Sequence, residues 1–430
     1  MVITKGGVVL GATAIALSTV AVTGTGIHLS QSQAFFQESP KEIVDEVWQI
    51  INHQYVDTNF NKLDWQNVRQ EYLDKPYNNK TEAYDAVREM LEKLGDPYTR
   101  FMNPEEFKNM QIDTSGELTG VGIQIAKDEE SDRLIVIAPI EDTPAFEAGI
   151  LAKDIIFKIN DVDTKGMDVN DAVSLIRGKP GSSVSLTIKR SQGEVNYDIV
   201  RAKIKIHPVR SATKETNVGK VGYIRLTQFS AQASREMRES IEKLEKQEVS
   251  GYVLDLRSNP GGLLYASIDI ARMWLQEGAI VSTVDRSGEN ERKWATNNAL
   301  TDKPLVILID GGSASASEIL SGALQDNQRA ALVGTQTFGK GLVQSVRSLG
   351  DGSGLAVTIA KYLTPSGRDI NKEGIPPDYI VELEEEEREK LQGDRTLIGT
   401  DEDPQFTKAL QVLGKKIIAD KNHLDRASTK

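Results

Sequence analysis

The chain contains no cysteine and only 4 histidines among its 430 residues. Without cysteine it can form no disulfide and has no thiol nucleophile, and a zinc site is not expected. Acidic residues outnumber basic ones by 63 to 51, which gives a formal net charge of −12. That charge argues against nucleic acid as a partner, because nucleic acid is itself negative. No motif indicates a metal or a cofactor. A hydrophobic content of 39% is typical of a globular chain with several domains.

Long apolar runs are also scarce, and the most apolar stretch is at the N-terminus. Lys5 precedes an uncharged segment from Gly6 to Leu29, and Ser32-Gln33-Ala34 offers the small residues that signal peptidases read. The segment is rich in glycine, alanine and threonine, so it is a weak membrane span. We expect residues 1–34 to be a cleaved export signal. The alternatives are an uncleaved anchor, which would associate the protein with a membrane, and a buried helix.

Apolar residues recur at three- and four-residue intervals between Ser39 and Met110, a spacing typical of amphipathic helices. The sequence predicts a helix N-cap at Thr81 and a helix stop at Gly95. We expect residues 35–112 to form a helical domain whose apolar stripe packs on a neighbouring domain or on a second subunit. In the second case the protein would be a homodimer.

Between Thr114 and Lys205 the pattern changes to short β-forming runs separated by turns. The turn Gly120-Val121-Gly122-Ile123 exposes backbone N–H groups that suit a carboxylate, and the strand after it offers an edge to an extended peptide. Taken alone, this turn is equally typical of a glycine-rich hairpin. Ordered landmarks follow it, and with them residues 113–205 resemble a PDZ domain. These landmarks are Pro144-Ala145, Ala148-Gly149-Ile150, Lys153-Asp154-Ile155-Ile156 and Ile159-Asn160.

Strands and helices alternate after Thr216, which predicts an α/β layer with a buried sheet over residues 206–383. The predicted strands are 221–226, 251–256, 280–284, 305–309, 331–335 and 355–361, and the predicted helices are 233–247, 264–275 and 316–328. Residues 384–430 are expected to form a helical extension. We interpret its acidic run at 384–387 as a solvated helix face.

The segment Gly312-Ser313-Ala314-Ser315-Ala316-Ser317-Glu318 places serines among small residues at the start of a predicted helix, and Lys340 follows within Phe338-Gly339-Lys340-Gly341. A serine hydroxyl is a weak nucleophile until a base takes its proton, and a lysine with a lowered pKa is such a base. Spacing alone leaves Ser313 and Ser317 open as nucleophiles. Taken alone, each of these residues is typical of a turn or of a surface charge.

Further residues complete a hydrolase site. The turn from Asp255 to Gly262 ends a predicted strand and exposes backbone amides, so Gly261 or Gly262 would supply one oxyanion donor and Ala316 N–H the second. The Gln344 amide would orient Lys340. Glu318 would assist the site or complement the helix dipole. A histidine mechanism would need His28, His53, His207 or His423. The first lies in the export segment, the second in the N-terminal helix and the last in the tail, and His207 has no orienting motif.

These motifs together resemble the carboxyl-terminal processing proteases, the tail-specific Ser/Lys peptidases. They are Asp-Leu-Arg-x-Asn-Pro-Gly-Gly, Gly-x-x-Ala-Ser-Ala-Ser-Glu and Phe-Gly-Lys-Gly-x-x-Gln, preceded by the PDZ-like block, so the resemblance runs from about residue 40 onward. It implies a multidomain α+β chain with an N-terminal helical region, a PDZ domain and a crotonase-like ββα core. It also implies Ser315 as nucleophile, Lys340 as general base and Gln344 as its orienting partner. The substrates would be polypeptides with free C-termini.

Two segments, 60–65 and 95–101, look most similar to the branch of this family found in cyanobacteria and plastids. That branch includes the peptidase that trims the photosystem II D1 precursor, so the resemblance implies a place in the periplasm or the thylakoid lumen. Two alternatives stay open: general tail-dependent degradation of exported proteins, and a catalytically silent PDZ scaffold.

Arg177 ends the predicted PDZ helix and is a candidate for gating. An inter-domain hydrogen bond from this arginine to Gln344 would couple tail binding to the active site. The alternative is that Arg177 satisfies the carbonyl groups at the end of its own helix.

Overall fold

A computed structural model describes residues 39–128, 131–140, 143–190, 193–288 and 290–428. The expected export segment lies outside these residues. Within them, no helix combines the length and the apolar character that crossing a bilayer requires.

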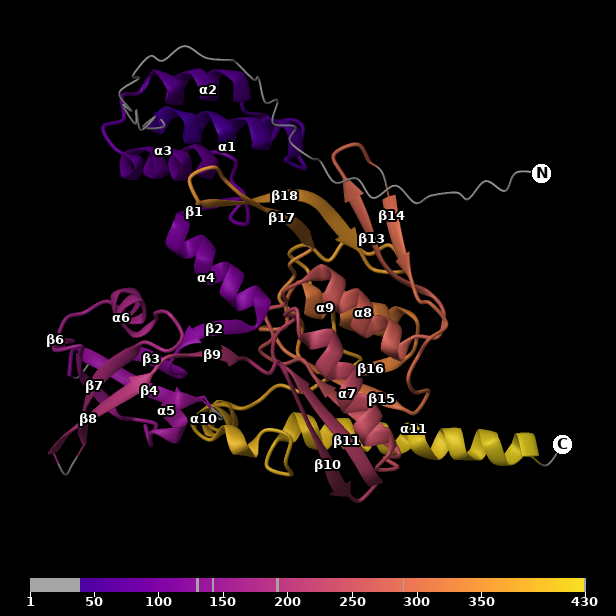
Figure 1. The fold of residues 1–430 in the computed structure, drawn as a ribbon. Coiled ribbons are helices and arrows are strands. Elements are labelled where there is room, and N and C mark those ends of the chain that lie inside the picture. The colour runs from indigo at the N-terminus through magenta and orange to yellow at the C-terminus, as the bar shows by residue number, and fades with distance from the viewer. Residues whose placement is uncertain (1–38, 129–130, 141–142, 191–192, 289, 429–430) are drawn as a thin grey trace, which may run out of the picture. The chain divides into compact units, whose positions relative to one another are not determined.

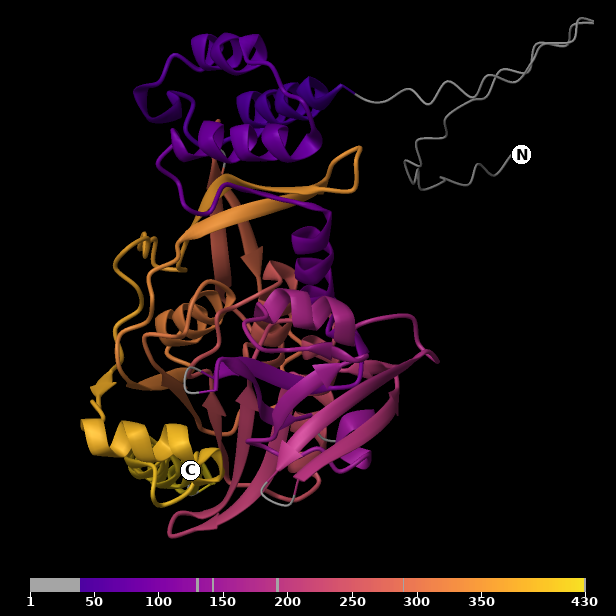
Figure 2. The same ribbon diagram turned by 90° about the vertical axis from the view of Figure 1, so that its left-hand side faces the viewer.

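The N-terminal helices form a small bundle that rests on a β-hairpin of the α/β core (Figures 1 and 2). The bundle contains α1 (Pro40–Gln54), the short η1 (Phe60–Lys62), α2 (Trp65–Asp74) and α3 (Lys80–Glu92). Its apolar stripes share one core with Leu349, Leu355 and Val357 of the hairpin, so the stripes pack on a neighbouring domain of the same chain.

The predicted N-cap at Thr81 is wrong, because Asn79 caps α3. The Asn79 side chain accepts a hydrogen bond from the Glu82 N–H at 3.0 Å. Asparagine is at least as good a cap as threonine, and a glutamate three residues after the cap is the capping-box spacing.

After the bundle, β1 (Arg100–Met102) and α4 (Pro104–Ser115) lead to the PDZ-like part. There, β3, β4, β5, β7 and β8 form an antiparallel sheet in that order, with β6 paired to β5. The strands are β2 (Glu117–Gly120), β3 (Ile123–Asp128), β4 (Arg133–Pro139), β5 (Ile155–Ile159), β6 (Val162–Asp163), β7 (Ser183–Arg190), β8 (Gly193–Val200) and β9 (Ala202–Lys205), and the helices are α5 (Pro144–Glu147) and α6 (Val169–Ile176). β2 and β9 pair with each other where the chain enters and leaves this part.

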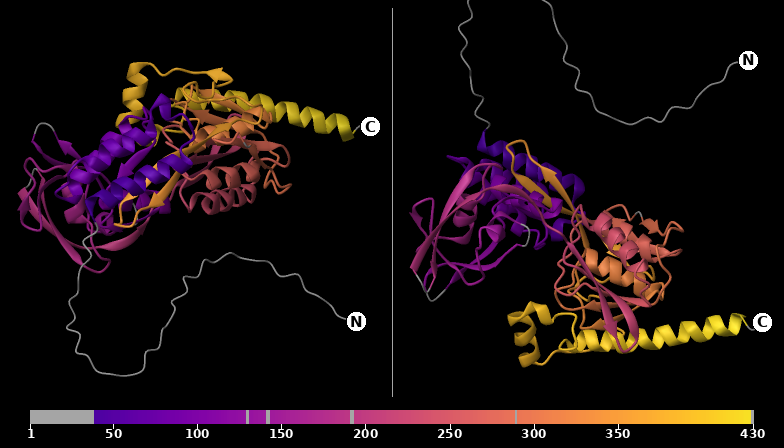
Figure 3. Two further views of the ribbon diagram at one scale, coloured as in Figure 1. Left: turned by 90° about the horizontal axis from the view of Figure 1, so that it is seen from above. Right: turned by 60° about the horizontal axis from the view of Figure 1, so that its bottom comes forward.

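The α/β core is built on a sheet with the order β10-β11-β12-β15-β16-β19, parallel from β11 onward. Alternate residues of its strands face opposite layers, as the two-residue period of a strand requires. In β15, Leu305 and Ile307 face α7, α8 and α9, whereas Val306 and Leu308 face α11, the long helix in Figure 3. Bounds are β10 (Val209–Thr216), β11 (Gly219–Leu226), α7 (Ala233–Glu245), β12 (Gly251–Asp255), α8 (Leu264–Trp274), β15 (Leu305–Ile309), α9 (Ala316–Asp326), β16 (Ala330–Gly334), β19 (Tyr379–Ile380) and α11 (Pro404–Ser428).

A second sheet, with the order β1-β18-β13-β14 and β17 paired to β18, connects the core to the helical bundle. It consists of β13 (Ala279–Asp285), β14 (Asn290–Trp294), β17 (Leu342–Ser348) and β18 (Gly354–Leu363) together with β1. The acidic run begins α10 (Glu385–Gly393), and Glu384, Glu385 and Glu386 are exposed or half-buried, as expected for a solvated face. The predicted multidomain α+β architecture is confirmed.

Candidate active site

Ser315 occupies the turn between β15 and α9 in a strained backbone conformation. It is the N-cap of α9, with φ 54° and ψ −110°, a region that residues with a side chain seldom adopt. Gly261 packs directly against it, because a Cβ on that glycine would lie 2.6 Å from the Ala314 carbonyl oxygen and 2.9 Å from the Ser315 Cβ. This close packing fixes the position of the serine.

The two neighbouring serines are structural. The Ser313 hydroxyl donates to the Leu256 carbonyl at 2.9 Å, the Ser317 hydroxyl donates to the Asn259 carbonyl at 2.9 Å, and both side chains are fully buried. Of the three serines, Ser315 is the one that lines the pocket described below. The geometry therefore favours Ser315 as the nucleophile.

Glu318 ties the serine turn to the lysine loop. Its carboxylate is completely buried, and one oxygen accepts from the backbone N–H groups of Ser315 at 2.8 Å and Lys340 at 2.9 Å. The other oxygen accepts from Gly339 N–H at 2.7 Å and the Thr337 hydroxyl at 2.6 Å. A single carboxylate thus holds the backbone of both candidate catalytic residues. The sequence signal was the capping-box spacing from Ser315 to Glu318.

Tyr362 of β18 contacts the backbone carbonyl groups of the same two residues, Ser315 and Lys340. Its buried hydroxyl lies 3.2 Å from the Ser315 carbonyl oxygen and also contacts the Lys340 carbonyl oxygen. Burial raises the pKa of the Tyr362 hydroxyl well above its ordinary value, so it stays a proton donor.

The Lys340 side chain is half-buried next to an aromatic ring. Its Nζ is 4.7 Å from the centre of the Tyr98 ring. Burial, with a smaller contribution from the Arg100 guanidinium, lowers the pKa of Lys340 below its ordinary value, which favours the neutral amine that a general base requires. Tyr98 and Arg100 were not predicted as site residues. Their segment stood out in the sequence only through its likeness to one branch of a family.

Two backbone N–H groups beside Ser315 have no acceptor among the described residues. They belong to Ala316, the first residue of α9, and Gly262. The Gly261 N–H is occupied, because it donates to the Asn259 side chain at 2.9 Å. Gly262 has φ 140°, and a Cβ there would lie 2.3 Å from the Phe229 carbonyl oxygen. Of the two glycines predicted as oxyanion donors, Gly262 therefore fits better, and Gly261 serves the packing of the serine turn.

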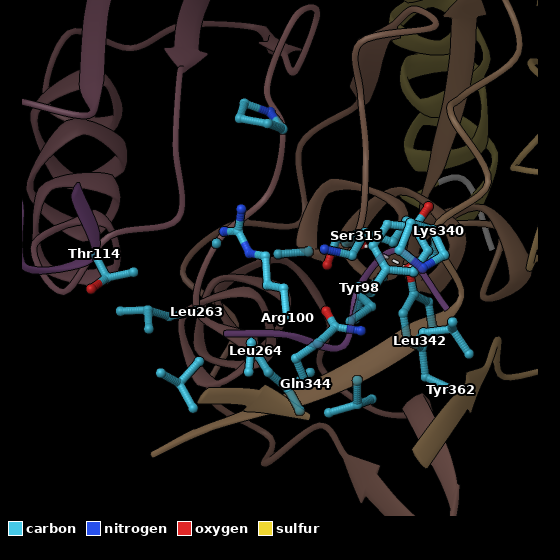
Figure 4. A pocket seen from close by; sticks show the side chains of 18 residues that line it. Tyr98, Arg100, Thr114, Leu263, Leu264, Ser315, Lys340, Leu342, Gln344 and Tyr362 are labelled. Atoms are coloured by element: carbon cyan, nitrogen blue, oxygen red, sulfur yellow. Dashed lines mark hydrogen bonds between the residues drawn. The ribbon is translucent and has the colours of Figure 1, made fainter. Parts of the chain in front are cut away.

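A pocket of about 480 Å³ brings these groups together (Figure 4). Tyr98, Ser315 and Lys340 cluster on one side of it, and Thr114 of α4 lies on the other. The remaining walls are largely apolar and include Leu263, Leu264, Ile319, Leu342 and Val343.

Gln344 also lines this pocket, but its hydrogen-bond partner is not the lysine. Its Nε2 donates to the Thr358 hydroxyl at 3.5 Å. Among the described residues, no hydrogen bond joins Lys340 Nζ to Ser315 or Gln344. Catalytic hydrogen bonds in the absence of substrate are often long, so the orienting role of Gln344 stays a prediction.

A buried ion cluster supports the turn that carries Gly262. The Arg257 guanidinium donates to Asp255 at 2.7 Å and to Asp403, just before α11, at 2.7 Å. Burial alone would raise the pKa of Asp255, but Arg257, Arg225 and the hydrogen bond from Tyr223 together hold that pKa below its ordinary value. The cluster therefore links the start of α11 to the strand end from which the oxyanion turn departs.

The predicted tail-binding turn opens the edge strand of the PDZ-like sheet. Gly120, Val121 and Gly122 precede β3, whose sheet partner within the described residues is β4 alone. Gly122 has φ 85°, and a Cβ there would lie 2.3 Å from the Thr143 hydroxyl oxygen, so glycine is required at this position. α6 packs beside β3. An unpaired strand edge next to a helix is the geometry that strand addition requires.

Arg177 contacts neither of its two expected partners. Its guanidinium donates to the Asn109 side chain of α4. The carbonyl groups at the end of α6 are satisfied by Arg201 instead, which donates to Ile176 at 2.7 Å and to Leu175 at 2.9 Å. The predicted hydrogen bond from Arg177 to Gln344 is therefore wrong. The alternative, in which Arg177 satisfies the carbonyl groups at the end of its own helix, is also wrong. The gating role itself stays a prediction.

No histidine among the residues that the structure describes lines this pocket. His207 Nδ1 lies 2.8 Å from Glu236 Oε1, between the PDZ-like part and the core, and its side chain is largely exposed. His53 lies at the end of α1. His28 is outside the described residues.

A serine and a lysine at the mouth of an α/β core, preceded by a PDZ domain, define a serine-type peptidase. Three family patterns match the chain: a Tricorn protease C1 domain at residues 36–94, a PDZ domain at 135–190 and Peptidase family S41 at 220–381. The chain belongs to the carboxyl-terminal-processing proteases of peptidase family S41, in their cyanobacterial and plastid branch.

Relatives from both groups support this assignment. A carboxyl-terminal-processing protease of Picosynechococcus sp. is 46% identical over 387 residues, which covers 90% of this chain and 91% of that protein. The chloroplastic carboxyl-terminal-processing peptidase 2 of Arabidopsis thaliana is 41% identical, covering 78% of this chain and 67% of that protein. The solved structure of a photosystem II D1 C-terminal processing protease is 36% identical, with a TM-score of 0.57, and covers 86% of this chain and 99% of that one.

Proposed function

We propose that the protein is an exported endopeptidase that captures a substrate tail on its PDZ domain and cuts near the C-terminus with Ser315 and Lys340. The observation that carries this proposal is the Glu318 carboxylate, which holds the backbone N–H groups of both residues at the wall of one pocket. The lowered pKa of Lys340 supports its role as the base.

The proposed reaction begins when neutral Lys340 accepts the Ser315 hydroxyl proton as the serine oxygen attacks the scissile carbonyl carbon. The resulting oxyanion accepts hydrogen bonds from the Ala316 and Gly262 N–H groups, which are free to donate. Lys340 then gives its proton to the leaving amine, and the acyl-enzyme forms. Water hydrolyses that ester with the lysine again acting as the base.

Tail capture would occur by strand addition along β3. The substrate carboxylate would accept hydrogen bonds from the turn Gly120-Val121-Gly122-Ile123, and the peptide would lie between β3 and α6. Amidating the last residue of a peptide ligand should therefore weaken its binding to the full chain. Equal affinity for free-acid and amidated peptides, measured with Ser315→Ala enzyme to prevent cleavage, would remove this turn as the carboxylate site.

The D1 precursor of photosystem II is the substrate that we propose. The support is the 36% identity to a photosystem II D1 C-terminal processing protease over 86% of this chain. General tail-dependent degradation is the competing function. Incubation with a D1-precursor C-terminal peptide and with an unrelated tailed protein separates the two: maturation gives one defined cut, whereas degradation gives many fragments.

The test of the chemistry uses Ser315→Ala and Lys340→Arg. Arginine stays protonated and cannot act as a base. Both variants should lose about 10³-fold or more of the activity, as nucleophile removal does in other serine peptidases. Turnover near the wild-type rate in either one would reject the Ser/Lys mechanism and leave the silent PDZ scaffold to be considered.

Location and assembly are further parts of the proposal. The N-terminal segment would direct export to the periplasm or thylakoid lumen, by cleavage or as a membrane anchor, and N-terminal sequencing of the cellular protein distinguishes these two. A homodimer through the N-terminal helices is tested by light scattering. The packing of their apolar stripes on Leu349, Leu355 and Val357 gives that dimer no direct support.

A further inference from the structure

A chain of side-chain hydrogen bonds runs from Gln344 in the pocket to Asp96 at the exit of the helical bundle. Gln344 Nε2 lies 3.5 Å from the Thr358 hydroxyl oxygen, which lies 3.3 Å from the Thr99 hydroxyl oxygen. Thr99 in turn donates to an Asp96 carboxylate oxygen at 2.7 Å. Thr99 and Thr358 are both buried. Water therefore cannot easily substitute for either hydroxyl.

Asp96 determines which group donates and which accepts along this series of hydrogen bonds. A carboxylate only accepts hydrogen bonds, and its two oxygens accept from the Tyr98 N–H at 2.9 Å and the Thr99 hydroxyl at 2.7 Å. Thr99 has a single proton, and the shorter, charge-assisted bond to Asp96 uses it. The Thr99 oxygen is then left to accept, and it does so from the Thr358 N–H at 3.0 Å, while the Thr358 hydroxyl oxygen lies 3.3 Å away.

These donor and acceptor roles determine how the Gln344 amide is turned. The Thr358 hydroxyl oxygen accepts from the NH₂ group of Gln344. With the Thr99 proton held by Asp96, the Thr358 hydroxyl would turn its own proton toward the Thr99 oxygen and so stay an acceptor for that amide. Gln344 and Lys340 line the same pocket, so the carbonyl oxygen of Gln344 would be the atom left to accept from the lysine. A carbonyl oxygen is the atom needed there, because both the neutral and the protonated lysine donate hydrogen bonds.

Local backbone features place both ends of this hydrogen-bond series beside the pocket. A register shift in the β17–β18 pairing lies between Val343 and Gln344, and such irregularities redirect a side chain. At the other end, Tyr98 is the neighbour of Thr99, and its ring lies against Lys340 Nζ. The same short segment therefore reaches both the general base and the residue that is proposed to orient it.

We propose that Thr99, held by Asp96, is a positioning residue that sets the amide orientation of Gln344. The helical bundle would in this way contribute to the catalytic geometry of the protease core. The proposal rests on the role proposed above for Gln344 as the partner of Lys340.

The first experiment compares Thr99→Val with Thr99→Ser in the full chain. Valine has the shape of threonine without the hydroxyl, so kcat should fall by about 10- to 100-fold with KM nearly unchanged, since small misplacements in a catalytic group have effects of this size. Serine keeps the hydroxyl and should restore most of kcat. Thr301→Val is the matched control: Thr301 is also buried, its hydroxyl accepts from Lys303 N–H at 3.2 Å, and it does not line the pocket.

The second experiment tests whether Thr99 acts through Gln344. If it does, Thr99→Val added to Gln344→Ala should lower kcat no further, because the amide to be oriented is already gone. A purely structural role would instead lower kcat by the same factor in both backgrounds.

The third experiment uses Asp96→Asn to exchange the donor and acceptor roles along this hydrogen-bond series without removing a side-chain group. The Tyr98 N–H cannot turn round, so the new side chain must place its oxygen there and its NH₂ at Thr99. The Thr99 hydroxyl would then donate to Thr358 and Thr358 to Gln344, so that the Gln344 NH₂ faces the lysine. We expect kcat to fall by at least about 10-fold while the melting temperature changes little. Asp57→Asn is the control, since Asp57 accepts N–H bonds from Asn59 and Asn61 in the same bundle.

The outcomes separate the two proposals. If Gln344→Ala lowers kcat but Thr99→Val and Asp96→Asn leave it at the wild-type value, the positioning role of Thr99 is wrong and the catalytic role of Gln344 stands. If Gln344→Ala itself has wild-type kcat, the role of Gln344 is wrong and this proposal falls with it. If Thr99→Val does not fold, Asp96→Asn decides: wild-type kcat rejects the positioning role and reduced kcat supports it.

Discussion

Replacing Glu318 with glutamine should impair both folding and catalysis, although the two side chains have nearly the same shape. The carboxylate accepts four hydrogen bonds and is fully buried. A glutamine keeps one accepting oxygen, which would stay with the Ser315 and Lys340 N–H groups, because both would otherwise be lost. The NH₂ group would then face Gly339 N–H and the Thr337 hydroxyl.

The magnitude follows from those four donors. The Thr337 hydroxyl can turn and accept, but Gly339 N–H is left buried without an acceptor, at about 1–3 kcal/mol, and the bonds that remain lose their charge assistance. We expect Glu318→Gln to lower the free energy of unfolding by about 2–4 kcal/mol. We expect kcat to fall by at least about 10-fold, because the Lys340 loop is no longer drawn to the serine turn.

The assay combines denaturant unfolding, steady-state cleavage of a tailed substrate and labelling of Ser315 by a fluorophosphonate. Glu106→Gln is the matched control: Glu106 makes the same capping-box bond to the Asn103 N–H at 2.8 Å, but in an exposed position. It should change stability by less than about 1 kcal/mol and activity not at all. Wild-type stability and kcat in Glu318→Gln would refute the idea that this carboxylate holds the site together.

Four further outcomes are expected. Activity should rise with pH through the folded-state pKa of Lys340, because the protonated amine cannot act as a base and burial lowers that pKa; a flat profile would contradict this. The unfolded chain binds more protons between the lowered and the ordinary pKa of Lys340, so Lys340→Met should be inactive yet raise the melting temperature near neutral pH, with a gain that shrinks as pH rises; a lower melting temperature would be the contrary result. Gly262→Ala should be strongly destabilised and inactive because φ is 140° and its Cβ would meet the Phe229 carbonyl, whereas Gly352→Ala, at φ 87° with open space around it, should lose about 1 kcal/mol and keep kcat. Arg177→Ala should leave stability nearly unchanged and lower cleavage of tailed protein if the Asn109 contact couples α6 to the site; equal tail affinity and turnover would end the gating hypothesis.

The sequence predicted best those elements whose residues carry their own structural signal. The continuous apolar run of β15 and the apolar periodicity of α7 appear in the structure within two residues of their predicted bounds. β10, β14 and β17 were missed, because Val209–Thr216, Asn290–Trp294 and Leu342–Ser348 are largely polar or exposed and pair mainly through their backbones. Such strands form because a neighbouring strand is present, and no single segment shows this.

The candidate site divides in the same way. Small residues around Ser315 and glycines around Lys340 are local signals, so these positions could be found in the sequence. Tyr98 reaches the pocket, and Thr99 reaches Thr358, only because the helical bundle packs on the β17–β18 hairpin. The partner of Arg177 depends on how α4 runs. Contacts between segments this far apart in the chain leave no periodicity or spacing that could be read beforehand.

The order of synthesis gives the Asp255–Arg257–Asp403 cluster a further meaning. Asp403 leaves the ribosome 146 residues after Arg257, a delay of roughly 7–30 seconds at ordinary elongation rates. During that interval the guanidinium lacks its second carboxylate, and the turn bearing Gly262 lacks part of its support. A nascent chain therefore carries Ser315 well before the turn bearing Gly262 has its full support. If Gly262 N–H is an oxyanion donor, the proposed catalytic site is completed only after α11 has docked on the core.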